Sequence, residues 1–459
     1  MTGLTPLDWV AAQHDGILET LCQFAAISSV STDPAYAAGM AEGAAFLADH
    51  MAWCGLENVV VAPTAGHPVV MGDWLHAEGQ KTILIYGHYD VQPPDPVEKW
   101  QSPPFEPMLR DGRLYGRGVS DDKGPVIVAL SAIAAFLRGA GKLPVNVKFL
   151  IEGEEEIGSA HLDAFVAEHA AALGADFVLS ADGAMWRVDL PTVTVASRGL
   201  CALEVTVTGA AKDLHSGRHG GSVANPLQAL SRLLASLHDE TGAVAVAGFY
   251  DQVLVPSAAE RATVQAIPFD EPAYLQAVGA SEAAGEVGWS TLERNWLRPT
   301  LELNGIWGGY SGPGSKTVIP SEAHAKITCR LVPDQAPGSI RDCVETHLRR
   351  HCPPGVTLKV TQEPGGAQPS AIASDHSGLH LAMQVLEEIY GEPALQVRMG
   401  ATIPIGGIFK HRLGLDTVFF SFSTADEDYH APNEFFRISR LHDGLRAWIR
   451  YLTLLGQAA

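Results

Sequence analysis

The segment TILIYGHYD, residues 82–90, contains the clearest indication of the fold of this chain. Its first five residues form a short apolar run typical of a buried strand, and His88 and Asp90 follow directly. Three further apolar runs of the same form lie at residues 145–151, 177–180 and 417–423. Helix-like segments separate these runs, and such an alternation predicts an α/β fold. We therefore expect a three-layer domain in which helices cover both faces of a mixed, largely parallel sheet.

Candidate metal ligands follow all four of these predicted strands. The carboxyl ends of neighbouring parallel strands meet at one edge of a sheet, which is where α/β proteins bind their ligands. Besides His88, the residues at these ends are the acidic run at 152–156, Asp182, and the group Asp426, Glu427, Asp428 and His430. A fifth polar segment, GRGVSDDKGP at residues 116–125, brings Asp121 and Asp122 to the start of an apolar helix.

Each polar segment also has a plain structural explanation when it is taken alone. An aspartate before a helix can act as its N-cap, a run of glutamates is usually a solvated loop, and a lone His-x-Asp can form a surface ion pair. Asp182 before Gly183 fits a turn, and His430 fits a loop histidine. We favour a metal site because a single sheet would bring all of these segments together.

The types of ligand narrow the choice of metal. Imidazoles and carboxylates without thiolates suit zinc, with manganese and cobalt as alternatives. Several carboxylates in one site indicate two ions that share a bridging carboxylate and activate a water between them. Adjacent glutamates suit such a site, since one can bind metal while its neighbour stays free as a general base.

Length, charge and cysteine content limit the class of protein. With 459 residues, the chain is long enough for two domains. Its net charge of −21 disfavours nucleic acid and anionic membranes as partners. The six cysteines form no CxxC pair, which favours reduced thiols, and the N-terminus lacks the pattern of a secretory signal. The longest apolar run, 125–137, is too short to span a bilayer, so we expect a cytoplasmic protein without a membrane partner.

The pattern of predicted elements changes twice along the chain. From about residue 192 the strands alternate like half-buried antiparallel strands, and a long irregular stretch follows from about 240 to 315. The α/β pattern returns after about residue 374. These changes predict a discontinuous catalytic domain, residues 1–195 and 372–459, with an α+β domain inserted at 196–371.

Seven segments resemble the motifs of a known family, in the family's order. They are GHYDVQPP, LYGRGVSDDKGP, EGEEEIGS, KDLHSGRHGG, KTVIP, CRLVP and YHAPNE, and they run from about residue 85 to 433. The family is that of the dinuclear zinc metallopeptidases, which includes carnosinase-like dipeptidases, aminoacylase and glutamate carboxypeptidase. The chain is most similar to the cytosolic carnosinase-like dipeptidases. The resemblance implies two divalent metal ions per subunit, a small peptide substrate, and a homodimer formed through an inserted lid and dimerisation domain.

The resemblance also implies a role for each ligand. His88 and Asp182 would bind the first metal ion, and Glu156 and His430 the second. Asp121 would bridge both ions. The family pattern further implies a cis peptide bond between Asp121 and the residue that follows it.

Catalytic roles follow from the same resemblance. Glu155 would be the general base and later the acid that protonates the leaving amine. Asp90 would orient His88, as partners of metal-bound histidines commonly do. His215 would reach the active site of the partner subunit and stabilise the tetrahedral oxyanion.

Substrate binding would use Arg330, whose guanidinium suits the carboxylate of a peptide. Thr317 and Thr402 would line the same pocket. The segment GATIP at 400–404 resembles a family Gly-Gly-Ser-Ile-Pro segment that often follows a glutamate, but here Met399 precedes it. This departure affects how the amino group of a substrate would be recognised.

The leading functional hypothesis is two-metal hydrolysis of the amide bond of dipeptides or small peptides. An N-acyl amino acid deacylase with the same metal site is the alternative, to which Met399 points. A non-enzymatic metal-binding protein is disfavoured because the free base candidate Glu155 stands beside Glu156. Serine or cysteine hydrolysis is disfavoured because the sequence has no G-x-S-x-G motif.

Overall fold

The computed structural model describes residues 3–363 and 365–457, and the chain divides into two compact units. The first unit consists of Met1–Val195, Ile372–Val397 and Ile408–Ala459, and the second of Ala196–Ala371 and Arg398–Gly407. Residues 398–407 therefore group with the second unit, whereas the sequence pattern assigned them to the catalytic domain. The reason is that this segment packs against residues near the start of the second unit, where Arg198 contacts the backbone of Gly400.

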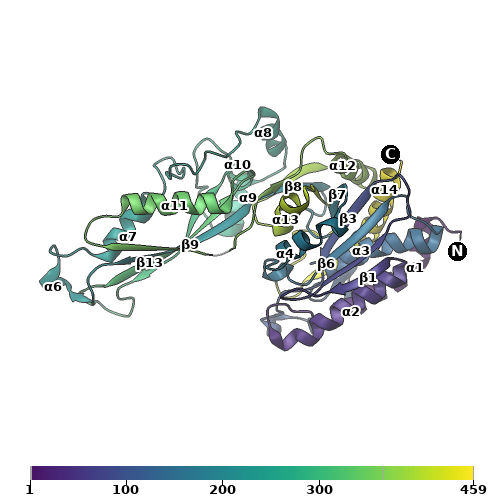
Figure 1. Cartoon of the computed structure of the whole chain (residues 1–459), viewed down its shortest axis with the longest axis horizontal. Helices are drawn as coiled ribbons and strands as arrows, with labels where there is room; N and C mark the ends of the chain where they lie inside the picture. Colours follow the sequence, from purple (N-terminus) through teal and green to yellow (C-terminus); the bar gives the residue numbers. More distant parts are fainter. Residues whose placement is uncertain (1–2, 364, 458–459) are drawn as a thin grey trace. The chain divides into compact units, whose positions relative to one another are not determined.

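The first unit is built on a six-stranded mixed sheet (Figure 1). In spatial order its strands are β1 (Glu57–Ala62), β2 (Val69–Trp74), β6 (Asn146–Glu152), β3 (Thr82–His88), β7 (Phe177–Ser180) and β17 (Thr417–Phe419). The last four run parallel to one another, β2 pairs antiparallel with β6, and β1 pairs antiparallel with β2. This arrangement confirms the predicted mixed, largely parallel sheet.

Helices cover both faces of this sheet. The long helices are α1 (Pro6–Ala25), α2 (Ala37–Cys54), α3 (Lys123–Ala134), α12 (Ser377–Tyr390) and α14 (Ile438–Leu455). Ile83 and Ile85 of β3 join the core beneath α3, whereas Tyr86 packs on the other face against Phe409 of α13 (Pro404–Leu413). Every residue of β3 except Thr82 is buried, as expected for a strand covered on both faces.

The helix α3 is buried along its whole length and continues into a π-helical segment, Ala135–Ala140. Within the described part of the chain, Lys123–Ala140 is the one helix long and apolar enough to cross a membrane. In the fold 83% of this segment is buried, so its apolar character is explained by its place in the core. It begins directly after Asp121 and Asp122, and Oδ2 of Asp122 accepts a hydrogen bond from the backbone N–H of His88 at the end of β3 (3.2 Å).

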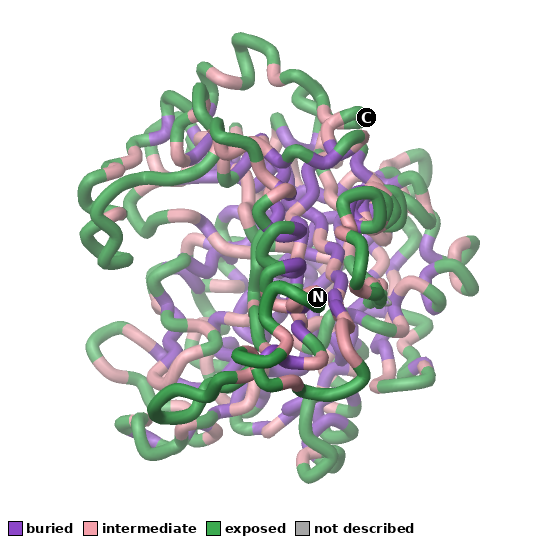
Figure 2. The backbone as a smooth tube through the Cα atoms, turned by 90° about the vertical axis from the view of Figure 1, so that its left-hand side faces the viewer, coloured by how far each residue is buried: buried purple, intermediate pink, exposed green. Residues whose placement is uncertain are grey.

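The second unit has an antiparallel sheet in the order β11 (Thr300–Gly308), β13 (Glu322–Leu331), β9 (Gly199–Thr208) and β14 (Thr357–Gln362). Residues of β9 alternate between buried and half-buried, as expected when helices cover only one face. Those helices are α7 (Pro226–Ala235) and α11 (Pro337–His351), which close a second apolar core. Figure 2 shows the whole chain coloured by the burial of each residue, with buried residues in purple and exposed loops in green.

The stretch from 240 to 315 is less irregular than the sequence pattern indicated. It contains three short helices, α8 (Ala258–Gln265), α9 (Glu271–Val278) and α10 (Thr291–Leu297), before β11. Capping boxes start α8 and α10, where Ser257 pairs with Glu260 and Ser290 with Glu293. Helices of seven or eight residues are too short to show a clear apolar period, so the sequence pattern missed them.

Candidate metal centre

The first unit brings its candidate ligands to one edge of the six-stranded sheet. His88 is the last residue of β3, and Asp182 follows β7 by two residues. Glu156 lies in a turn of 3₁₀ helix after β6, and Asp121 lies just before α3. His430 lies in the loop after β17. All five predicted ligands therefore lie together, although they are spread over more than 300 residues of sequence.

Asp121 lies at the centre of this cluster. Its Oδ1 is 3.0 Å from Nε2 of His88, and its Oδ2 is 3.0 Å from Nε2 of His430. Nε2 of His430 is also 3.0 Å from Oε2 of Glu156. Two groups have ligand atoms close enough to hold an ion, one made of His88, Asp121 and Asp182 and the other of Asp121, Glu156 and His430. Asp121 belongs to both groups, the position expected of a bridging carboxylate.

The backbone around Asp121 is held by a buried glutamate that the sequence analysis did not single out. Glu434 accepts hydrogen bonds from the backbone N–H of Gly118 (2.9 Å), Ser120 (3.0 Å) and Asp121 (3.2 Å). It also pairs with Arg117 at 2.6 Å, and both side chains are 1% exposed. Its only sequence signal is its place in the segment YHAPNE, four residues after His430. The peptide bond between Asp121 and Asp122 is cis, as predicted.

Asp90 contacts both His88 and the glutamate turn. Its Oδ1 is 3.4 Å from Nδ1 of His88, whose Nδ1 also lies 3.0 Å from the backbone oxygen of Asp90. The same carboxylate accepts hydrogen bonds from the backbone N–H of Glu155 (3.2 Å) and Glu156 (3.1 Å). Gln92 donates to Oε2 of Glu156 at 2.9 Å. Asp90 thus ties the position of the imidazole to the position of the two glutamates.

The charges of the cluster fit divalent cations. Four carboxylates, those of Asp121, Glu155, Glu156 and Asp182, lie around two imidazoles. Burial and the neighbouring carboxylates Asp121 and Glu156 raise the pKa of Asp182 to about 6, and burial likewise raises the pKa of Glu155. Carboxylates crowded in a buried site are unfavourable unless cations neutralise them. The donor set of imidazole nitrogens and carboxylate oxygens is one that binds zinc, manganese or cobalt.

The other predicted site residues belong to the second unit. His215 is exposed at the end of the short strand β10 (Leu214–His215), where its Nδ1 accepts a hydrogen bond from the backbone of Gly217. The backbone oxygen of Thr317 accepts a hydrogen bond from Ser216, the residue after His215. Arg330 on β13 donates from Nη1 to Oγ1 of Thr402 at 2.6 Å. Within the second unit, the structure therefore brings His215 close to Thr317, and Arg330 close to Thr402.

Fold and site together define a metal-dependent hydrolase with an α/β catalytic unit. The chain belongs to Peptidase family M20/M25/M40, whose profile matches residues 84–454. This finding confirms the predicted family and the predicted enzyme class, a metallopeptidase.

Known proteins with similar sequences include two named dipeptidases. The chain is 32% identical to the Beta-Ala-His dipeptidase of Homo sapiens over 80% of this chain and 73% of that protein. It is 30% identical to the Cys-Gly metallodipeptidase DUG1 of Candida albicans over 99% of this chain and 98% of that protein.

Solved structures of the same family have the same fold. An M20 family metallo-carboxypeptidase from Sulfolobus solfataricus superimposes with a TM-score of 0.83 at 30% identity, covering 96% of this chain and 99% of that one. A dipeptidase from Saccharomyces cerevisiae superimposes with a TM-score of 0.78 at 25% identity, covering 100% of this chain and 99% of that one.

Proposed function

We propose that the chain is a dipeptidase that hydrolyses the amide bond of small peptides with two divalent cations. The observation that carries this proposal is the position of Asp121, shared by two ligand groups, with Glu155 adjacent to the ligand Glu156. The named dipeptidases among its relatives support peptides as the substrate class. Zinc is the first choice of metal, with manganese and cobalt as alternatives.

His88 and Asp182 would hold one cation, Glu156 and His430 the other, and Asp121 both. The bound cations would supply Lewis-acid activation of a water and of the scissile carbonyl. Asp90 would keep His88 and the glutamate turn in position, through the contacts it makes with both.

Glu155 would accept the proton of the attacking water and later give a proton to the leaving amine. Burial raises the pKa of its carboxyl group, which brings the group closer to the range suited to proton transfer in both directions. Its backbone is fixed by the hydrogen bond to Asp90 at 3.2 Å.

Arg330 would bind the carboxylate of the substrate, with Thr402 orienting its guanidinium through the hydrogen bond at 2.6 Å. Thr317 lies beside His215 in the structure, so it would line this pocket from the partner subunit. His215 would stabilise the oxyanion in the active site of a partner subunit. This role requires a homodimer, which the lid and dimerisation domain at 196–371 would form. We expect the enzyme to work in the cytoplasm. The exposed position of His215 is compatible with a contact to a second chain.

Metal-stripped protein, tested on a panel of dipeptides after adding back zinc, manganese or cobalt, checks this proposal. We expect no hydrolysis without metal and recovery with at least one of the three ions. The Glu155→Gln variant should keep its metal and lose turnover, while Glu168→Gln, an exposed glutamate of α4 (Leu162–Glu168), should keep both. Full activity of the stripped protein would contradict the metal-dependent mechanism, and unchanged turnover of Glu155→Gln would reject Glu155 as the base.

An N-acyl amino acid deacylase is the second candidate, and Met399 favours it. A methionine at this position cannot pair with a substrate ammonium, as a glutamate can. Side-by-side assays of a dipeptide and its N-acetylated form separate the two functions. Preference for the free amine supports the dipeptidase, and preference for the acetylated form supports the deacylase.

A further inference from the structure

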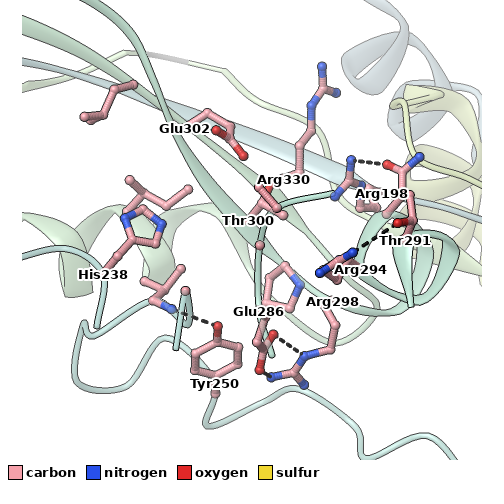
Figure 3. Close-up of a pocket in the computed structure, with 18 of the residues that line it drawn as sticks. Arg198, His238, Tyr250, Glu286, Thr291, Arg294, Arg298, Thr300, Glu302 and Arg330 are labelled. Carbon is pink, nitrogen blue, oxygen red and sulfur yellow. Dashed lines mark hydrogen bonds and ion pairs between the residues drawn. The ribbon is translucent and has the colours of Figure 1, made fainter. Parts of the chain in front are cut away.

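The second unit contains a cavity with more arginines than its own carboxylates can neutralise (Figure 3). The volume is about 820 Å³, which is in the range of small-molecule sites and much larger than a single ion needs. Four guanidinium groups line it, from Arg198, Arg294, Arg298 and Arg330, and only two carboxylates do, from Glu286 and Glu302. The cavity therefore has an excess of two positive charges in a chain whose net charge is −21.

One of these arginines is already neutralised. Arg298 donates from Nε and Nη2 to the two carboxylate oxygens of Glu286, at 2.7 and 2.6 Å. In the described residues, 3–363 and 365–457, no carboxylate lies within ion-pair distance of Arg198, Arg294 or Arg330. Glu302 is exposed, so water screens its charge.

Arg198 is the most buried of the three arginines that have no carboxylate partner. It is 8% exposed, and its partners are neutral: Nε donates to the backbone oxygen of Gly400 (2.7 Å) and Nη2 to Oδ1 of Asn295 (2.9 Å). Among the residues that the structure describes, its Nη1 has no hydrogen-bond partner. A buried cation with a free N–H is costly unless an anion or water satisfies it, and it lines a cavity large enough for such a group.

Arg294 extends into the same cavity from α10. It lies between Arg198 and Arg298 in Figure 3, and its Nη2 donates to Oγ1 of Thr291 at 3.0 Å. Gly285 permits this position, because a Cβ atom there would meet Cδ of Arg294 at 3.0 Å. Gly400 similarly makes room for Asn295, whose Oδ1 would lie 2.3 Å from a Cβ atom at that position. These two glycines therefore leave room for Arg294 and for the Asn295 side chain that binds Arg198.

We propose that this cavity binds a small organic anion, with Arg198 and Arg294 as its main ligands. The anionic group is a phosphate or a carboxylate, since a guanidinium donates two parallel hydrogen bonds to either. Tyr250 and Tyr274 line the cavity and provide aromatic surface for the organic part of the ligand. The proposal goes beyond the proposed peptidase function, because neither Arg198 nor Arg294 has a part in that function.

Arg330 lines the cavity and also has a role in the proposed peptidase function, so the test measures binding instead of turnover and centres on Arg294. Calorimetric titration of the full-length holoenzyme with inorganic phosphate and with glutarate, at constant ionic strength, provides the measurement. Repeating both titrations after chelation removes any contribution from anions bound to metal. We expect saturable binding of at least one probe that survives chelation.

Two variants and one control locate the site. Arg294→Gln should weaken binding of that probe at least tenfold, and Arg198→Gln should do the same if it folds. Arg232→Gln removes one exposed arginine from α7 of the same unit and should leave binding unchanged, which controls for net charge. Stronger binding of phosphate would identify a phosphorylated ligand, and stronger binding of glutarate a carboxylate ligand. Absence of saturable binding by the wild type, or equal binding by Arg294→Gln, would overturn the proposal whatever the peptidase assays show.

Discussion

Glu434 lies 3.2 Å from the backbone nitrogen of Asp121, so that a fully buried glutamate holds the backbone of the proposed bridging ligand. Its carboxylate also neutralises Arg117, whose side chain is 1% exposed. One residue therefore performs two tasks: it satisfies a buried guanidinium and fixes the loop before α3. Glu434 therefore holds the backbone of a candidate metal ligand although it is not a candidate ligand itself.

The Glu434→Gln variant should lose stability and metal affinity together. A glutamine has nearly the same shape, but it leaves the charge of Arg117 unpaired in the interior. Breaking a buried ion pair in this way typically costs about 3–5 kcal/mol. Urea unfolding of the metal-free protein measures the loss of stability, and titration with zinc measures the affinity. Glu282→Gln, at an exposed position, is the matched control, and a stable Glu434→Gln variant with normal affinity would contradict this role.

Substitution of Asp121 should affect both proposed metal positions, whereas substitution of the other ligands should affect one. We expect Asp121→Asn to lower the metal content of the purified protein from two ions per chain to fewer than one. Asp182→Asn and Glu156→Gln should each leave about one tightly bound ion, because each belongs to a single ligand group. Elemental analysis after dialysis provides the measurement. If Asp121→Asn kept one ion as firmly as the other two variants, Asp121 would not be the bridge.

The five proposed metal ligands could be predicted because each has a local sequence signal. His88 and Asp182 directly follow apolar strands, and Asp121 directly precedes an apolar helix. Parallel strands place such residues at one edge of the sheet, so local patterns imply a shared location. Glu434 has no comparable signal, since its partners lie 313 to 317 residues away in sequence and its burial depends on the finished fold.

The second unit could be predicted only in outline. Strand alternation indicates its antiparallel sheet, but the attachment of 398–407 depends on contacts such as the bond between Arg198 and Gly400. The arginine-lined cavity is also invisible in the sequence, since its guanidinium groups come from segments around residues 198, 294 and 330. Single arginines at such spacing have no recognisable motif.

The Arg330→Lys variant should raise KM for dipeptides about tenfold with little change in kcat. Lysine keeps the charge but cannot bind a carboxylate with two parallel bonds or keep the same bond to Thr402. An interaction made equally in the ground state and the transition state affects KM alone. Dipeptides with a C-terminal amide should be hydrolysed poorly by both proteins and show no difference between them.

Thr402→Val provides a milder test of the same pocket. It removes one neutral partner of Arg330, worth about 0.5–1.5 kcal/mol, so KM should rise only about two- to tenfold. Steady-state kinetics with both substrate types measures these effects. A large fall in kcat at unchanged KM for Arg330→Lys would show that Arg330 acts in the chemical step instead.

His50 should make the protein less stable as the pH falls below neutrality. It packs between Phe46 and Trp53, at ring distances of 6.0 and 5.3 Å, and in the described part of the chain its Nε2 has no hydrogen-bond partner. Burial, and then the charge of Arg138, lowers the pKa of His50 from 6.5 to about 4. Between these two values the unfolded chain binds a proton at this histidine and the folded chain does not, so the free energy of unfolding decreases as the pH falls from 6.5 towards 4.

The His50→Phe variant should remove this dependence. Phenylalanine keeps a ring between Phe46 and Trp53 but cannot be protonated in the unfolded state. Between pH 7.5 and pH 4.5, the free energy of unfolding should fall less for the variant than for the wild type. The difference between these two decreases should be at most roughly 3 kcal/mol. Urea unfolding at both pH values measures it, with His76→Phe as the control because that histidine is exposed. Carboxylates that titrate in the same range contribute equally to both proteins and cancel in the comparison. Parallel pH profiles for the wild type and His50→Phe would show that His50 is protonated as readily in the folded protein as in the unfolded chain.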